Sequence, residues 1–233
     1  MALFRSPVKT TLRTGEPANG GRDPGGHGGR MATLVSGLAL IFSGLSYYES
    51  ALKQADLEVF VPPVIQYARD GGGDVELFSV PITIANSGSN TGTILALELI
   101  VTNPSEKAEP KTKTYYSAFI GEHPRETTAI NRAFAPISVP GRASYSETIR
   151  FYPQGNPLPR LIQEAGEFAF TLKLTIATPS DPSWLDRLIK IGTPAPLVFT
   201  RTLPWISDQQ LGFRRATASM HAKDWKATSS AGK

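Results

Sequence analysis

The chain of 233 residues contains no cysteine, which excludes disulfide bonds, thiol nucleophiles and cysteine-ligated metal sites. It has only three histidines, His27, His123 and His221, and it lacks the HExxH, Gly-x-Ser-x-Gly and phosphate-loop motifs. These absences remove most of the groups that hydrolases, metalloenzymes and nucleotide-binding proteins use. We therefore expect a protein that is not an enzyme and that has no metal, cofactor or catalytic residue.

Charged residues are also few, at 19% of the chain, and their small excess of +4 lies at the two ends. Residues 1–30 carry five basic against two acidic side chains, and residues 205–233 carry the same numbers. The middle of the chain is slightly acidic. Because a nucleic-acid-binding fold gathers Lys and Arg on one face, we expect no nucleic-acid partner.

A long uncharged run is present near the N-terminus, from Met31 to Tyr48. As a helix it would span about 27 Å, close to the thickness of the hydrocarbon layer. Arg30 precedes the run and Glu49 follows it, so the positive-inside rule places the N-terminus in the cytoplasm. The sequence predicts a transmembrane helix with a juxtamembrane extension over residues 31–56. A cleaved signal peptide and a buried helix of a soluble protein are the alternatives.

Residues 1–30, rich in glycine, are predicted to be a disordered basic cytoplasmic tail. Translation from Met31 would remove this tail. Within the apolar run, the tripeptide Ser-Gly-Leu occurs twice, seven residues apart, and places Gly37 and Gly44 on one helix face. Such a face allows close helix–helix packing, although small residues are also common in membrane helices.

From residue 57 onward the apolar residues alternate with polar ones, as in strands that have one buried face. The clearest strand runs from Phe168 to Ile176, and weaker candidates include Val59–Tyr67, which Pro62 and Pro63 confine to a sheet edge or a bulge. Short turns such as Asn86-Ser-Gly88 and Pro140-Gly141 join the runs. About eight such strands predict an antiparallel β-sandwich over residues 57–204.

One helix interrupts the alternation, beginning at Ser180 or Asp181 and carrying Trp184 on its apolar stripe up to Ile191. The residues that follow the last expected strand, 205–233, are polar and basic. We expect them to form a largely disordered C-terminal tail.

The segment from Val80 to Leu99 resembles a hairpin of bacterial immunoglobulin-like domains of the cell-adhesion-related and fibronectin III-like kind, in which an Asn-x-Gly turn follows an alternating strand. Ile137-Ser-Val-Pro140-Gly141 is similar to the entry of a later strand in those domains, and Ala165–Phe168 to the start of their last long strand. This resemblance covers residues 57–178 and implies an immunoglobulin-like β-sandwich used for adhesion, spacing or assembly. It transfers a class of function and no site residues.

Two segments that combine proline with an aromatic residue are candidate interaction surfaces. Phe151–Pro159 contains Tyr152 and Pro153, and Thr202–Ile206 contains Trp205. Trp is a residue type that often dominates interface energetics, although a Trp that caps the end of the sandwich would give the same sequence. An ordinary long turn is likewise the alternative for Tyr152 and Pro153.

The sequence thus predicts a non-catalytic, single-pass protein of the bacterial inner membrane whose periplasmic sandwich binds another envelope or membrane protein. One alternative is a carbohydrate- or ligand-binding sandwich, for which Tyr115, Tyr116, Tyr145 and Tyr152 would form the aromatic platform. The other is a hydrolase that uses His123 with Glu122 or Glu126 as acid and base.

Overall fold

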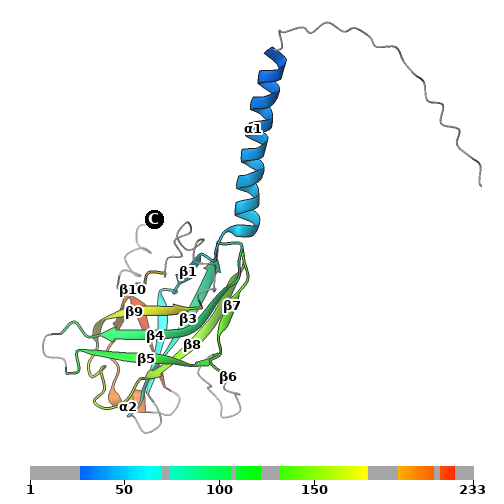
Figure 1. The fold of residues 1–233 in the computed structure, drawn as a ribbon. Coiled ribbons are helices and arrows are strands. Elements are labelled where there is room, and N and C mark those ends of the chain that lie inside the picture. Colours follow the sequence, from blue (N-terminus) through cyan, green and yellow to red (C-terminus); the bar gives the residue numbers. More distant parts are fainter. Residues whose placement is uncertain are drawn as a thin grey trace, which may run out of the picture. The chain divides into compact units, whose positions relative to one another are not determined.

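A computed structural model of the chain describes residues 27–69, 74–105, 109–121, 132–177, 194–212 and 216–223. The chain divides into two compact units, Met1–Leu45 and Ser46–Lys233. The first unit contains most of helix α1 (His27–Tyr47), and the second contains a short π-helix η1 (Tyr48–Leu52) and all the strands. Figure 1 shows these elements.

Helix α1 is apolar and, from Met31 onward, its side chains are exposed to solvent. Its large apolar residues include Leu34, Leu40 and Phe42, which are all more than half exposed. With η1, the stretch Met31–Leu52 is long and apolar enough to cross a membrane. This is the one N-terminal apolar helix that the sequence predicts, and it is compatible with a membrane anchor or a signal sequence. The helix begins at His27, before the predicted start at Met31.

The second unit is built from eleven antiparallel strands. In chain order they are β1 (Leu57–Phe60), β2 (Val64–Arg69), β3 (Glu76–Asn86), β4 (Gly92–Thr102), β5 (Thr112–Ile120), β6 (Arg132–Ala133), β7 (Ile137–Val139), β8 (Ser144–Pro153), β9 (Gly166–Ile176), β10 (Leu197–Leu203) and β11 (Thr217–Ala222). A short helix, α2 (Asp208–Gly212), lies between β10 and β11.

Eight of these strands close into a barrel, with the order β5-β8-β3-β2-β11-β10-β9-β4 and a final pairing of β4 with β5. The short strands β1, β6 and β7 each pair with a single barrel strand, namely β3, β5 and β4. The fold is therefore mainly β, as expected, but the prediction of an immunoglobulin-like β-sandwich is wrong. A sandwich keeps two separate sheets, whereas here the β4–β5 and β2–β11–β10 pairings join all the strands into one closed sheet.

Strand β11 explains much of the difference between the predicted sandwich and the observed barrel. Residues 205–233 were expected to form a largely disordered tail, but Thr217–Ala222 pairs with β2 on one side and with β10 on the other. Its Ala218 and Met220 point into the barrel and are buried. The run is short and only two of its residues are buried apolar ones, so its alternation is too weak to identify a strand from sequence alone.

The first expected strand, Val59–Tyr67, forms as two strands, β1 and β2, and β2 lies inside the sheet between β3 and β11 and not at an edge. Leu57–Phe60 pairs with one half of β3 and Gln66–Arg69 pairs with the other half, so both segments lie along the same side of β3. Pro62 and Pro63 fall between them, where neither ring disturbs a ladder of hydrogen bonds. The predicted helix around Trp184 and the loop around His123 lie outside the described residues.

The interior of the barrel is closely packed around Phe78 on β3. Its ring contacts those of Tyr67, Tyr115 and Phe170, with centroid distances of 5.4, 4.9 and 5.5 Å. Val80, Ile82 and Ile84 follow Phe78 on the same face of β3 and are also buried. Two of these three contacts are edge-to-face, and the close packing around Phe78 leaves little room for a ligand in this part of the barrel.

The linker that precedes β1 is held against one end of the barrel. Ser89 and Asn90 donate their backbone N–H groups to the carbonyl of Lys53, at 3.0 and 3.2 Å. Arg142 and Ser89 donate side-chain hydrogen bonds to the carbonyl of Glu49. The linker is therefore fixed to the two turns that join β3 to β4 and β7 to β8.

Asn86, the last residue of β3, organises this end of the barrel. Its side chain is buried, and its Oδ1 accepts from the N–H groups of Asp56 and Gly88 at 3.1 and 3.0 Å. Its Nδ2 donates to the carbonyls of Asn90 and Val139, at 2.8 and 3.0 Å. One amide group thus joins the linker to both turns, which is why Asn precedes the Ser-Gly turn here.

Glycine in the β3–β4 and β7–β8 turns allows the backbone of each turn to lie close to another backbone segment. A Cβ atom on Gly141 would lie 2.0 Å from the carbonyl oxygen of Ser89, and one on Gly88 would lie 1.9 Å from that of Gln54. We expect Gly141→Ala to lower the free energy of unfolding of the full-length protein by about 1–3 kcal/mol, because backbone must move to relieve the overlap. Thermal or urea unfolding in detergent measures this loss.

Gly44→Ala is the matched control, because a Cβ atom there has nothing within 4 Å. Equal unfolding midpoints for Gly141→Ala and the control would contradict the close approach of the two turns.

Candidate functional site

The opposite end of the barrel contains a buried carboxylate. Glu76 is the first residue of β3, and its side chain is fully buried beneath the segment that follows Pro159. Its Oε1 accepts from the Tyr67 hydroxyl at 3.0 Å and from the N–H of Ile162 at 2.8 Å. Its Oε2 accepts from the Tyr115 hydroxyl at 3.0 Å and from the N–H of Leu161 at 2.8 Å. Four donors therefore surround one carboxylate.

The two tyrosines serve this carboxylate as hydrogen-bond donors. Burial raises the pKa of Tyr67 and of Tyr115 well above the ordinary value of 10.0, and the negative charge of Glu76 raises both further. Both hydroxyls therefore stay protonated at any physiological pH. Because every bond to Glu76 comes from a fixed donor, the carboxylate holds the 161–162 segment onto the barrel and is not free to act on a substrate.

Arg69, at the end of β2, extends the same network to the surface. Its guanidinium donates to the Tyr67 hydroxyl at 3.0 Å, to the carbonyl of Ile162 at 3.2 Å and to the carboxylate of Asp208 at 2.7 Å. The Arg69 side chain is 3% exposed, whereas that of Asp208 is 78% exposed. The hydrogen bond from Arg69 and its positive charge hold the pKa of Asp208 below its ordinary value. This ion pair fastens helix α2 to the end of the barrel.

Two clefts lie on either side of the 161–166 segment. One, of about 520 Å³, is lined by residues that include Arg69, Leu203, Trp205 and Asp208. The other, of about 580 Å³, is lined by residues that include Asn103, Glu109 and Glu167. Gln163, Glu164 and Ala165 line both clefts, so the two adjoin. We call them together the end groove.

Trp205 is the most exposed large apolar side chain among the described residues of the barrel unit, at 79%. It follows Pro204 just after β10, and it forms no ring contact with another described aromatic residue. Burial of an indole in a protein complex is strongly favourable. Because the Trp205 ring is largely exposed in the free protein, a ligand that covered it would gain this free energy of burial. The alternative that Trp205 merely caps the barrel does not agree with this exposure.

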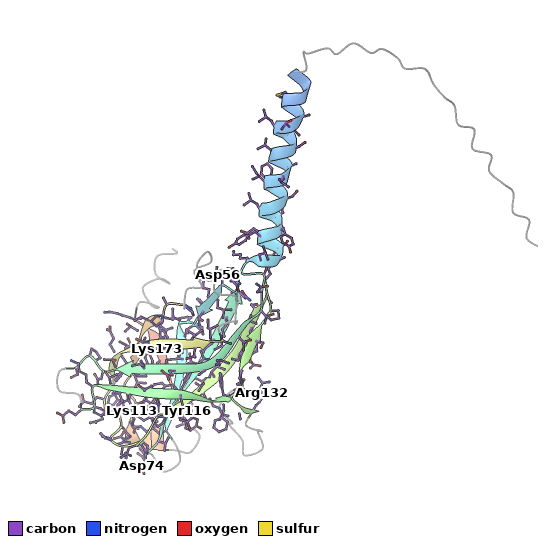
Figure 2. All side chains as sticks on the ribbon, in the orientation of Figure 1. Asp56, Asp74, Lys113, Tyr116, Arg132 and Lys173 are labelled. Carbon is purple, nitrogen blue, oxygen red and sulfur yellow. The ribbon has the colours of Figure 1, made fainter. Side chains whose placement is uncertain are left out.

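The end groove and the linker lie at opposite ends of the barrel. Strand β3 runs from Glu76 at the groove to Asn86 at the linker, and eleven residues of strand span about 33 Å. Figure 2 shows the same separation, with Asp56 of the linker and Asp74, which precedes β3, at opposite ends. A ligand in the groove would therefore be held away from the attachment point of the linker.

The other candidate interaction residues lie elsewhere. Tyr152 is on the outer wall of the barrel, partly buried, with its ring edge-to-face against Phe119 at 5.7 Å. Pro153 ends β8 with its side chain buried, so it has no surface to offer a partner. Neither residue lines the end groove.

The tyrosines expected to form an aromatic platform are also dispersed. Tyr115 is buried beneath Glu76, whereas Tyr116 is exposed on the outer wall, where Figure 2 labels it, and is the register partner of Tyr152. Tyr145 is partly buried on β8, at the linker end. The structure therefore brings only Tyr116 and Tyr152 together.

Gly37 and Gly44 lie on α1, and a Cβ atom at either would meet nothing within 4 Å. Their shared helix face is open, and its packing against a second helix stays a prediction. Of the three histidines, only His221 has a described side chain, and it is partly buried on β11. In the described part of the chain, no three His, Asp or Glu side chains are grouped so as to hold a metal ion.

Sequence reasoning missed Glu76, Arg69 and Asp208. One signal was present in the sequence. Side chains two residues apart in a strand face the same side, so Glu76 faces inward like Phe78, Val80 and the other inward residues of β3. A charged residue at an inward position predicts a buried polar network. The partners of Glu76 come from residues 9 to 86 positions away along the chain, and no short motif links them.

No family model matches the chain, and no curated protein matches it. Among solved structures, it is similar to the putative ApaA protein from Bordetella pertussis, at 16% identity over 64% of this chain and 94% of that one, with a TM-score of 0.27. It is also similar to a beta-glucosidase from Listeria innocua in complex with glucose, at 12% identity, with a TM-score of 0.24. The second match covers 53% of this chain and only 15% of the enzyme.

Matches this distant show neither a family nor an activity. The resemblance of residues 57–178 to immunoglobulin-like and fibronectin III-like domains is not tested by these matches and stays a prediction.

Replacement of Glu76 by Gln tests the buried network. In either orientation the amide NH₂ of Gln would face the backbone N–H of Leu161 or of Ile162, which leaves two donors opposed. We expect Glu76→Gln to lower the free energy of unfolding by about 1–3 kcal/mol in urea titrations. Glu98→Gln, on the outer wall, is the control, and an equal effect of both substitutions would show that Glu76 does not hold the 161–162 segment.

The Arg69–Asp208 pair predicts a pH dependence. A carboxyl group whose pKa is lowered on folding stabilises the folded state above its unfolded pKa, and this contribution is lost as the pH falls through the lowered value. We therefore expect Asp208→Asn to be less stable than the wild type at pH 7. The difference should vanish as the pH falls well below 3.8, the ordinary value. A difference in urea midpoint that persists unchanged to about pH 2 would contradict the ion pair.

Proposed function

We propose that this protein is a non-catalytic, membrane-anchored interaction module of the bacterial envelope, which binds another envelope or membrane protein through the end groove. The observation that carries the proposal is the 79% exposure of Trp205 beside a cleft of about 520 Å³. Tryptophan is one of the three residue types that are enriched at the hot spots of protein interfaces.

The apolar helix supplies the anchor in this proposal. Its exposed side chains need a nonpolar surrounding, and its uncharged run, Met31–Tyr48, spans about 27 Å as a helix, close to the thickness of the hydrocarbon layer. The basic residues before it and Glu49 after it favour a cytoplasmic N-terminus and a periplasmic barrel.

The linker supports the same proposal. Residues 49–56 are bound to the barrel by hydrogen bonds and are not a free tether. The end groove lies at the other end of the barrel, about 33 Å away along β3, so the bound linker leaves it open to a partner protein.

The buried acidic group supports binding over catalysis. Glu76 is the one fully buried carboxylate among the described residues, and all its hydrogen bonds serve to hold the end of the barrel together. Rigidity of this kind lowers the entropic cost of binding, because the groove does not have to be ordered by its ligand.

Photo-crosslinking in intact cells tests the proposal. Ala165 is exposed and lines both clefts, so a photoreactive phenylalanine analogue at this position samples the groove and leaves Trp205 in place. We expect a discrete protein adduct that disappears when Trp205→Ala is added. The same analogue at Val198, 66% exposed on the outer wall, is the control. Identical adducts at both positions, or none at position 165, would contradict the proposal.

A further inference from the structure

We infer that the end groove binds a basic segment of its partner, with an arginine or lysine side chain placed against the Trp205 ring. This inference rests on the proposed function and specifies the chemistry of the partner. It follows from the groove's shape, from the one exposed indole on its rim and from the sign of the charges along it.

The indole supplies the first element of recognition. A cation placed over an aromatic face is attracted by the negative charge density of the ring, and tryptophan binds cations best. Trp205 has its ring largely in solvent, and Pro204 and Ile206 beside it in the chain provide apolar contact for the stem of a long side chain.

The charges along the groove supply the second element. Among the described residues, the acidic ones that line it are Glu109, Glu164, Glu167 and Asp208, whereas the basic one is Arg69. Arg69 is buried and already bonded to Asp208, and Glu167 is paired with Lys223 at 3.2 Å. Glu109 and Glu164 form no salt bridge within the described ranges.

The positions of these two carboxylates suit an extended peptide segment that runs along both clefts. Glu164 lines both clefts, including the one that contains Trp205, whereas Glu109 lies only in the second cleft. A cation over the indole would therefore find Glu164 in the same cleft, and a second basic residue further along the ligand would approach Glu109. Complementary charge at a rim gives specificity and a faster association rate.

Arg160 adds positive charge near one edge of the groove. Its positive charge lowers the pKa of Asp208, so it lies near the α2 edge of the groove. It is not among the residues that line either cleft. The acidic character of the groove is therefore carried by Glu164 and Glu109, away from α2.

The experiment uses the full-length protein in nanodiscs and three labelled hexapeptides in fluorescence anisotropy. One peptide alternates Arg with Gly, the second alternates Glu with Gly, and the third alternates Ser with Gly. We expect binding of the arginine peptide alone. Trp205→Ala should weaken it about tenfold, Trp205→Phe less, and Glu164→Gln about threefold, with further loss at high salt.

Controls on the outer wall separate the groove from general charge attraction. Val198→Ala and Glu98→Gln remove an exposed apolar residue and an acidic residue outside the groove and should leave the affinity unchanged. Equal binding of the three peptides, equal effects of Glu164→Gln and Glu98→Gln, or no binding of the arginine peptide would each overturn the inference.

A neutral tetrasaccharide serves as a fourth probe. Its binding in a manner that depends on Trp205, with no binding of the arginine peptide, would also overturn the inference and would favour a carbohydrate ligand. Failure of this inference is distinguishable from failure of the proposed function. A groove-specific protein adduct in cells that is unaffected by Glu164→Gln would leave the interaction module standing and remove only the basic partner.

Discussion

The pairing of β11 with both β2 and β10 is the constraint on which the rest of this structure depends. Without that strand, β2 and β10 would each present an open edge, and the sheet would remain unclosed. The chain that leads into β11 passes one end of the barrel, where α2 and the Trp205 segment lie beside the end of β2. The Arg69–Asp208 pair, which spans 139 residues, exists because β10 and β2 are only one strand apart.

The two ends of the barrel are each fastened by one buried polar side chain. Asn86 joins the linker to two turns at one end, and Glu76 joins three barrel strands to the 161–162 segment at the other. Both groups have their hydrogen-bonding capacity met by fixed partners, so burial does not penalise them as it would an unpaired group. The consequence is a rigid body with a fixed attachment point and, about 33 Å away along β3, a fixed groove.

The sequence allowed most of the strands to be located, but neither β11 nor the closure of the sheet. The alternation in β3, β4 and β9 is strong because their inward residues are nearly all aliphatic or aromatic, and the kink at Pro62-Pro63 follows from a missing N–H donor. Sandwich and barrel strands have the same two-residue period, so the period does not indicate which strands pair. Trp205 could be identified as a candidate because of its residue type alone. Glu76 and Arg69 could not be paired, since their partners meet only once the barrel has closed.

The proposed function requires that the apolar helix remains in the membrane and carries the barrel on its outer side. Protease treatment of spheroplasts that contain the protein with a C-terminal tag tests it most directly, with the mass of the membrane-bound fragment as the second reading. We expect the tag to be digested and a fragment containing residues 31–52 to stay in the membrane. Protection of the tag would contradict the orientation, and release of an intact barrel that lacks the helix would show a cleaved signal sequence in place of an anchor.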